Sequence, residues 1–184
     1  EILKAQSIAA RTYAVYHMLL SANSAYDVKS DQSSQMFGSS TVRRGNADRA
    51  VDDTKNIIMT YANKPIIAYF YADSGGYTEN PGDVWGGRTF PYFAAEDDKY
   101  APANKWTFRI HEKKLRKIIN NSTNSSLSRI EKIYPAKTTK SGRWREIAFE
   151  DSSEKTFIDG NKLRNLLGSL NFRSLLISDA IKVN

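Results

Sequence analysis

Apolar residues recur at helical spacing along the first part of the chain. They fall three or four positions apart within a run that is rich in the helix formers Ala, Gln and Leu, namely Ile2, Ala5, Ile8, Ala9, Tyr13, Tyr16 and Leu20. This pattern predicts one long helix from Ile2 to about Ala22. Lys4 and Arg11 fall two turns apart on one stripe of this helix, so their cationic side chains are expected on the same side.

A hairpin pattern follows in residues 57–71. Two apolar runs, Ile57 to Tyr61 and Ile66 to Tyr71, flank the turn sequence Asn63-Lys64-Pro65, which is typical of a β-hairpin. Between the long helix and this hairpin, the polar stretch from Asn23 to Asn46 predicts a loop. Ala47 to Asn56 predicts a second, shorter helix.

The second half of the chain has a mixture of short strand and helix patterns. In chain order they predict a strand at Trp106 to Ile110, a helix at Glu112 to Ile119, a polar connector at Asn120 to Ser128, a hairpin of Ile130 to Lys137 with Arg143 to Phe149 around Ser141-Gly142, a helix at Asn161 to Leu167 that stops at Gly168, and a last strand at Leu175 to Val183. The predicted class is α+β, with the long N-terminal helix packed on antiparallel β-sheet with hairpins, and with a small C-terminal helix. We predict one domain over residues 1–184.

Composition excludes some chemistries and leaves a choice of partners. The chain has no Cys, and its two histidines, His17 and His111, lie far apart in sequence, so we predict no metal site and no cofactor. The net charge of +7 favours polyanions, which include nucleic acid, anionic lipid surfaces and acidic cell-wall polymers. The cations are scattered and no nucleic-acid-binding motif is present, so we predict no nucleic acid as partner.

The N-terminal residues resemble the interior of a longer protein. Residues 1–6 contain no initiator Met, no signal-peptide pattern and no N-cap before a run that is already helical. We therefore expect the chain to be a fragment whose parent protein continues before Glu1.

Several motifs, in a fixed order, resemble the family of stage II sporulation protein D and the LytB amidase enhancers. Glu1 to Ala14 resembles the family's EALKAQAxAARTYA stretch. The later matches are Gln35-Met36-Phe37-Gly38 with Q-V-Y-G, Ile58 to Tyr71 with a G-x-V-L-T-Y-x-G-K-P-I-x-A-x-Y pattern, Ser74 to Glu79 with S-G-G-x-T-E, Val84-Trp85-Gly86 with V-W-G, Pro91-Tyr92-Phe93 with P-Y-L, and Asp159 to Gly168 with a closing G-x-x-L-R-x-x-L-G. The resemblance therefore spans nearly the whole chain.

The resemblance implies a role at the bacterial cell wall. It implies export to the cell envelope and, as in the sporulation members, lytic transglycosylase action on peptidoglycan glycan strands that lack stem peptides. The alternative is a non-catalytic amidase enhancer or glycan-binding module, with a cell-wall amidase as partner. In the catalytic members the general acid is a Glu that precedes the position of Glu1 by about eight or nine residues, so this acid is expected before the chain begins.

The resemblance also assigns site residues. It places Arg11, Lys4 and Tyr92 in the catalytic site and assigns substrate binding to Gln35, Ser74, Gly75, Gly76, Thr78 and Trp85. Structural roles are the alternative: Arg11 as an ion-pair partner, Lys4 as a solvated charge, the glycines as turn residues, and Tyr92 and Trp85 as core aromatics. Ala94 and Ala95, which follow Pro91-Tyr92-Phe93, depart from the polar residues expected there and favour the binding or enhancer role.

Overall fold

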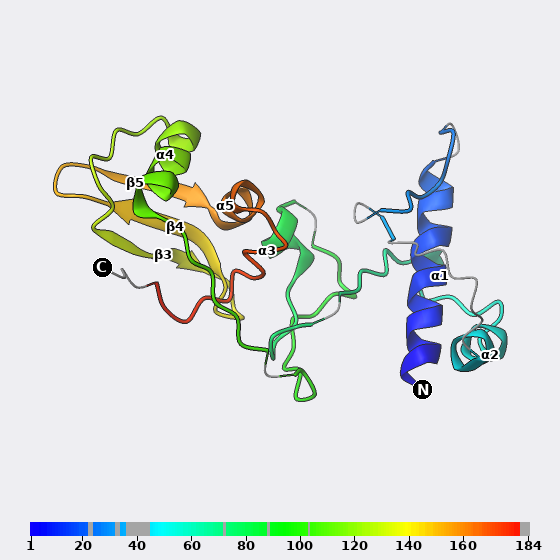
Figure 1. Cartoon of the computed structure of the whole chain (residues 1–184). Helices are drawn as coiled ribbons and strands as arrows, with labels where there is room; N and C mark the ends of the chain where they lie inside the picture. Colours follow the sequence, from blue (N-terminus) through cyan, green and yellow to red (C-terminus); the bar gives the residue numbers. More distant parts are fainter. Residues whose placement is uncertain are drawn as a thin grey trace. The chain divides into compact units, whose positions relative to one another are not determined.

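The structure, a computed structural model, describes residues 1–21, 24–31, 34–35, 45–71, 73–87, 89–102 and 104–180 (Figure 1). The chain divides into two compact units, Glu1–Ala72 (unit 1) and Asp73–Asn184 (unit 2). Both contain helices and antiparallel strands, so the predicted α+β class is confirmed. The prediction of a single domain over residues 1–184 stays a prediction. Among the described helices, none has the length and apolar character needed to cross a membrane.

Unit 1 is built around the predicted N-terminal helix. Helix α1 (Ile2–Leu20) contacts α2 (Gly45–Asp53) and the short strand β2 (Lys64–Pro65). Thr12 is its most buried side chain: the hydroxyl donates to the Ile8 carbonyl at 2.6 Å and accepts from the Met59 amide at 3.0 Å. This pair of hydrogen bonds ties the middle of α1 to the segment that leads into the hairpin.

The predicted hairpin of residues 57–71 is confirmed but pairs over a short length. Strand β1 (Thr60–Tyr61) pairs antiparallel with β2 across a turn in which Ala62 and Asn63 have φ values of 49° and 60°. Two successive residues with positive φ are typical of the tight turns that connect hairpin strands. The predicted helix at 47–56 is also confirmed as α2, although it ends at Asp53.

Unit 2 contains a three-stranded antiparallel sheet with β4 in the middle. Its strands are β3 (Lys132–Thr138), β4 (Trp144–Glu150) and β5 (Lys155–Asp159). The predicted hairpin of residues 130–149 is therefore confirmed as β3–β4. Helices α4 (Glu112–Thr123) and α5 (Gly160–Leu167) contact the sheet, and the short α3 (Pro81–Trp85) lies earlier in the unit. Gly168 ends α5 with a φ of 86°, as the sequence predicts.

Apolar residues from α4, α5, the sheet and the connector between α4 and β3 form the core of unit 2. They are Leu115, Ile119, Leu127, Ile130, Trp144, Ile147, Phe149, Ile158 and Leu163. Gly160 opens α5 directly against this core, and a Cβ at that position would collide with the Trp144 carbonyl and lie 3.1 Å from the Leu175 side chain. The first residue of α5 therefore has to be glycine for the helix to approach β4 this closely.

Three predictions about the second half of the chain are wrong. Residues 106–110 are extended with alternating burial but pair with no strand among the described residues. Residues 175–180 are irregular rather than a strand, and residues 181–183 lie outside the described residues. The connector predicted at 120–128 begins late because α4 continues to Thr123, where the Thr123 hydroxyl donates to the Ile119 carbonyl and Asn124 ends the helix in a left-handed conformation.

Candidate functional site

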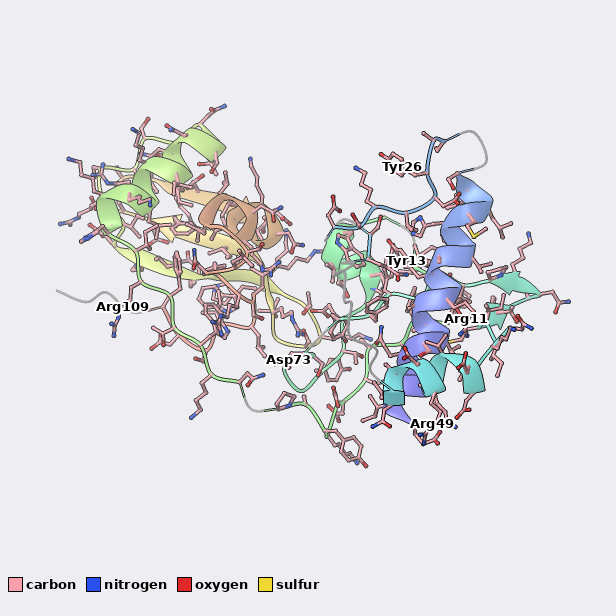
Figure 2. All side chains as sticks on the ribbon, turned by 45° about the vertical axis from the view of Figure 1, so that its right-hand side comes forward. Arg11, Tyr13, Tyr26, Arg49, Asp73 and Arg109 are labelled. Atoms are coloured by element: carbon pink, nitrogen blue, oxygen red, sulfur yellow. The ribbon has the colours of Figure 1, made fainter. Side chains whose placement is uncertain are left out.

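In unit 1, Arg11 binds the backbone at the C-terminal end of α2. Its guanidinium donates to the carbonyls of Thr54 at 2.7 Å, Ile57 at 3.0 Å and Val51 at 3.3 Å. These carbonyls lie where a helix leaves its last acceptors without partners and where its dipole favours a cation. The contacts support a structural role for Arg11, and the predicted catalytic role stays a prediction. Figure 2 shows Arg11 on α1.

Lys4 and Gln35 also contact protein groups of unit 1. The Lys4 ammonium lies 3.1 Å from an Asp53 carboxylate oxygen and 3.9 Å from one of Glu1. The hydrogen bond with Asp53 raises the pKa of Lys4 above its usual value. Gln35 donates from its side-chain amide to the Ala10 carbonyl at 2.8 Å. The rest of the Gln35-Met36-Phe37-Gly38 motif lies outside the described residues.

In unit 2, the motif Ser74 to Glu79 forms a loop that turns at its two glycines. Gly75 and Gly76 have φ values of 65° and 99°, which glycine adopts without strain. A Cβ on Gly75 would also lie 3.1 Å from Leu176. Asp73 accepts the Gly75 amide at 2.8 Å and the Asn104 side chain at 2.7 Å. The Asn104 hydrogen bond, followed by that of Gly75, lowers the pKa of Asp73.

The loop pairs with the segment that follows the Pro91-Tyr92-Phe93 motif. The buried Ser74 hydroxyl donates to an Asp98 carboxylate oxygen at 2.6 Å. Thr78 donates its amide to the Glu96 carbonyl and accepts the Glu96 amide on its hydroxyl, both at 2.8 Å. Tyr77 donates its hydroxyl to the Ala95 carbonyl at 3.1 Å. The loop thus bonds to backbone groups at positions 95 and 96 and to the Asp98 side chain, and any residue at position 95 would supply the same carbonyl.

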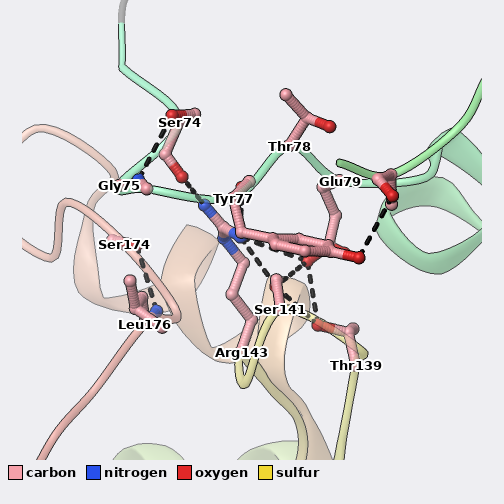
Figure 3. Close-up of polar contacts among 12 residues, drawn as sticks. Ser74, Gly75, Tyr77, Thr78, Glu79, Thr139, Ser141, Arg143, Ser174 and Leu176 are labelled. Atoms are coloured by element: carbon pink, nitrogen blue, oxygen red, sulfur yellow. Dashed lines mark hydrogen bonds and ion pairs between the residues drawn. The ribbon is translucent and has the colours of Figure 1, made fainter. Parts of the chain in front are cut away.

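Glu79, at the end of the loop, carries a buried carboxylate in a cluster of hydroxyl groups (Figure 3). Its Oε2 atom accepts from Ser141 at 2.7 Å and from Thr139 at 2.9 Å, and lies 3.5 Å from the Arg143 guanidinium. The Glu79 side chain is 9% exposed. Its Oε1 atom is buried with no hydrogen-bond partner among the described residues. A carboxylate in such a place needs a nearby cation, and Arg143 supplies it.

Arg143 connects this carboxylate to the start of the loop. Its guanidinium donates to the carbonyls of Ser74 at 2.5 Å and Tyr77 at 3.2 Å, and to the Ser141 hydroxyl at 2.7 Å. Figure 3 shows these contacts converging on one guanidinium. Arg143 lies between the β3–β4 turn and the first residue of β4. The hairpin therefore holds both ends of the Ser74–Glu79 loop through this one side chain.

Trp85 and the closing motif meet through α3. Asn80 caps α3 by accepting the Gly82 amide at 3.0 Å, and the Asn161 side-chain amide donates to the Val84 carbonyl. Trp85, the last residue of α3, is 64% exposed. Its predicted role in substrate binding stays a prediction, and its exposure argues against the alternative that it is a core residue.

Tyr92 belongs to a small aromatic cluster. Its ring stacks on Phe90 with the ring centroids 5.3 Å apart and an interplanar angle of 30°. The centroid of the Phe93 ring lies 4.9 Å from that of Tyr92. Tyr92 is half-buried. The predicted site role of Tyr92 also stays a prediction.

The predicted site residues therefore fall into two groups, Lys4, Arg11 and Gln35 in unit 1 and Ser74, Gly75, Gly76, Thr78, Trp85 and Tyr92 in unit 2. The geometry of unit 2 adds Asp98 and Arg143, which no motif indicated. No signal in the sequence pointed to Arg143, because the burial of Glu79 that calls for a cation is visible only in the folded chain. Within the described residues, no three His, Cys, Asp or Glu side chains are placed to hold a metal ion.

Comparison with known proteins supports one family. Residues 1–61 match the family model described as Stage II sporulation protein. An uncharacterized protein of Brachyspira hyodysenteriae is 32% identical over 188 residues, which cover 98% of this chain and 50% of that protein. The Amidase enhancer of Bacillus subtilis is 31% identical over 115 residues, covering 62% of this chain and 15% of that protein. Stage II sporulation protein D of the same organism is 34% identical over 127 residues, covering 58% of this chain and 36% of that protein.

These matches confirm the resemblance on which the site residues were assigned. The family model over residues 1–61 and the named relatives support the family of stage II sporulation protein D and the LytB amidase enhancers. It spans half, or less than half, of the length of these relatives.

Proposed function

We propose that the chain is a peptidoglycan-directed part of a cell-envelope lytic transglycosylase that cleaves denuded glycan strands. The observation that carries the proposal is the ordered set of family motifs, together with the matches to relatives named as a sporulation protein and an amidase enhancer. The net charge of +7 suits an anionic wall polymer. The proposal places the parent protein outside the cytoplasm.

The proposed chemistry needs a single carboxylic acid. The acid donates its proton to the glycosidic oxygen as the bond from that oxygen to the anomeric carbon breaks. Its conjugate base then takes the proton of the sugar's own 6-hydroxyl, whose oxygen bonds to the anomeric carbon and gives a 1,6-anhydro end. No water is consumed. By the family resemblance this acid precedes Glu1, so residues 1–184 are proposed to bind and position the glycan.

Glu79 is a poor candidate for this acid within the chain. Its Oε2 atom already accepts two hydroxyl hydrogen bonds and faces Arg143. Its Oε1 atom is buried, so neither carboxylate oxygen is placed to reach a glycosidic bond, as a general acid has to. The role that these contacts support is to fix the loop.

A non-catalytic role as an amidase enhancer is the second candidate. The observation that favours it is that Ser74 and Thr78, both predicted to bind substrate, direct their hydroxyls to Asp98 and to Glu96 of the chain itself. In that case the partner is a cell-wall amidase, and the loop supports a binding surface.

One experiment separates the two roles. The chain, alone and extended by the residues that precede it in the parent protein, is incubated with denuded glycan strands, and the products are searched by mass spectrometry for 1,6-anhydro ends. Products from the extended protein support the transglycosylase. Glycan binding without products, but with faster amide hydrolysis when an amidase is added, supports the enhancer. No retention on peptidoglycan by either protein refutes both.

A further inference from the structure

Unit 2 carries a shallow groove away from the Ser74–Glu79 loop. The segment Lys105 to Arg109 forms one side, and Leu170, Asn171 and Arg173 form the other. The groove has a volume of about 590 Å³. We name it the 105/173 groove.

The base of the 105/173 groove is aromatic. The rings of Trp106 and Phe108 each meet Phe172 edge to face, with centroids 5.4 Å apart and interplanar angles of 78° and 84°. Phe172 is buried, while Trp106 and Phe108 are half-buried. These contacts fix the rings before any ligand arrives, which lowers the entropy cost of binding.

The rim of the groove is cationic. Burial alternates along the extended segment, so Lys105 and Arg109 are both exposed and flank Thr107. Arg173 adds a third exposed cation from the opposite side. Figure 2 shows the Arg109 side chain projecting away from the ribbon. None of the described residues that line the groove is acidic.

The three cations of the groove have no partner among the described residues, unlike the other arginines that the structure describes in unit 2. Five of those arginines bond to protein acceptors, namely Arg116, Arg129, Arg143, Arg145 and Arg164. Arg109 and Arg173 make no hydrogen bond or ion pair with the described residues, and neither does Lys105. Unpaired guanidinium groups and fixed aromatic rings that line one groove favour an anionic ligand with flat, weakly polar faces.

We infer that the 105/173 groove is a second glycan-binding site, which takes a strand carrying free carboxylates on its muramic acid residues. This inference rests on the proposed function. Hydrolysis of the amide bond between a stem peptide and the glycan frees one carboxylate on each such sugar, whereas a strand that keeps its peptides has an uncharged amide there. Guanidinium groups bind carboxylates in a bidentate manner, and sugar faces stack on aromatic rings.

The spacing of the cations favours a polymer over a single sugar. Lys105 and Arg109 are four positions apart, so the Cα atoms of these two residues would lie about 13 Å apart in a fully extended chain. One sugar ring spans less than this distance. A strand of several sugar units can therefore contact Lys105 and Arg109 together.

The test compares two triple variants of equal charge. Lys105→Gln/Arg109→Gln/Arg173→Gln removes the cations of the groove, and Lys113→Gln/Lys114→Gln/Lys117→Gln removes three exposed lysines of α4 in the same unit. Binding is measured by calorimetry on denuded glycan and on the same glycan with its carboxylates amidated. We expect the groove variant to bind denuded glycan at least about tenfold more weakly than the unmodified chain, and the α4 variant to change by less than about twofold.

The possible outcomes separate this inference from the proposed function. Equal weakening in both variants would mean that only bulk charge matters. Unchanged binding by the groove variant would place the glycan elsewhere on the chain. Either result refutes the groove as a binding site and leaves the proposed function standing. Equal affinity of the unmodified chain for amidated and free strands would also refute it. Tighter binding to a single-stranded oligonucleotide of equal charge would assign the groove to nucleic acid. Failure of the unmodified chain to bind any glycan overturns the proposed function together with the groove.

Discussion

Replacement of Arg143 by Ala is expected to destabilise unit 2 strongly, because this residue holds the Ser74–Glu79 loop on the β3–β4 hairpin. The guanidinium is 16% exposed, and its loss removes donors from the Ser74 and Tyr77 carbonyls and leaves the Glu79 carboxylate buried without a cation. Orphaning one member of a buried pair costs about 3–5 kcal/mol. For a unit of this size that corresponds to a fall in melting temperature of about 12–20 °C.

The matched control is Arg145→Ala, two positions further along β4. Arg145 pairs with Asp83 at 3.0 Å, but its side chain is 47% exposed, so its loss is expected to cost less than about 1 kcal/mol. Trp85, Trp106 and Trp144 all lie in unit 2, so urea unfolding followed by tryptophan fluorescence reports on this unit.

Amide hydrogen exchange adds a local measurement to this comparison. It should become faster at Gly75 to Thr78 in the Arg143 variant. Equal destabilisation by the Arg143 and Arg145 variants, with unchanged exchange in the loop, would refute the reasoning.

Three further predictions concern other parts of the chain. Arg11→Ala should lower the stability of unit 1 by about 2–3 kcal/mol, because it removes a charged donor from three carbonyls. Amide hydrogen exchange in α2 should become faster. Unchanged exchange together with lost glycan binding would instead mean that Arg11 contacts the ligand. Gly160→Ala should cost at least about 2 kcal/mol because its methyl group meets the Trp144 carbonyl, whereas Gly45→Ala, with open space around it, should be neutral in thermal melts. Hydrogen bonds from the backbone of Ser153, then Ser128, hold the pKa of Asp151 well below its ordinary value of 3.8. The stability that these bonds supply is present above pH 3.8 and is lost as the pH falls further. The difference in melting temperature between the parent chain and Asp151→Asn should therefore become smaller from pH 6 to pH 3. A gap that stays constant would contradict the assignment.

Local sequence pattern predicted the helices well. Periodic apolar positions located α1, and a glycine signal located the end of α5 at Gly168. The strand expected at 106–110 failed because alternation reveals which side chains are buried, while a strand also needs a partner chain at hydrogen-bonding distance. Trp106 and Phe108 are indeed the half-buried members of the alternation, but they pack on Phe172 instead of joining a sheet.

Motif matching located the loop of the candidate site but not its supports. Ser74, Gly75, Gly76 and Thr78 lie in a single motif, so their common location follows from the sequence. Their partners Asp98 and Arg143 come from segments that only the folded chain brings near, and no local pattern marks them. The same limit applies to Arg11, whose acceptors are backbone carbonyls that every sequence possesses.

The contact between Glu79 and Arg143 joins residues 64 positions apart, which sets an order of events in folding. As the chain is made, the carboxylate is available long before its guanidinium partner exists, and it remains hydrated until the β3–β4 hairpin has formed. Closing a contact over such a separation is slow compared with forming a helix such as α1. The Gly-rich loop is therefore among the last segments to acquire its final shape, and a chain interrupted before residue 143 presents that loop unformed.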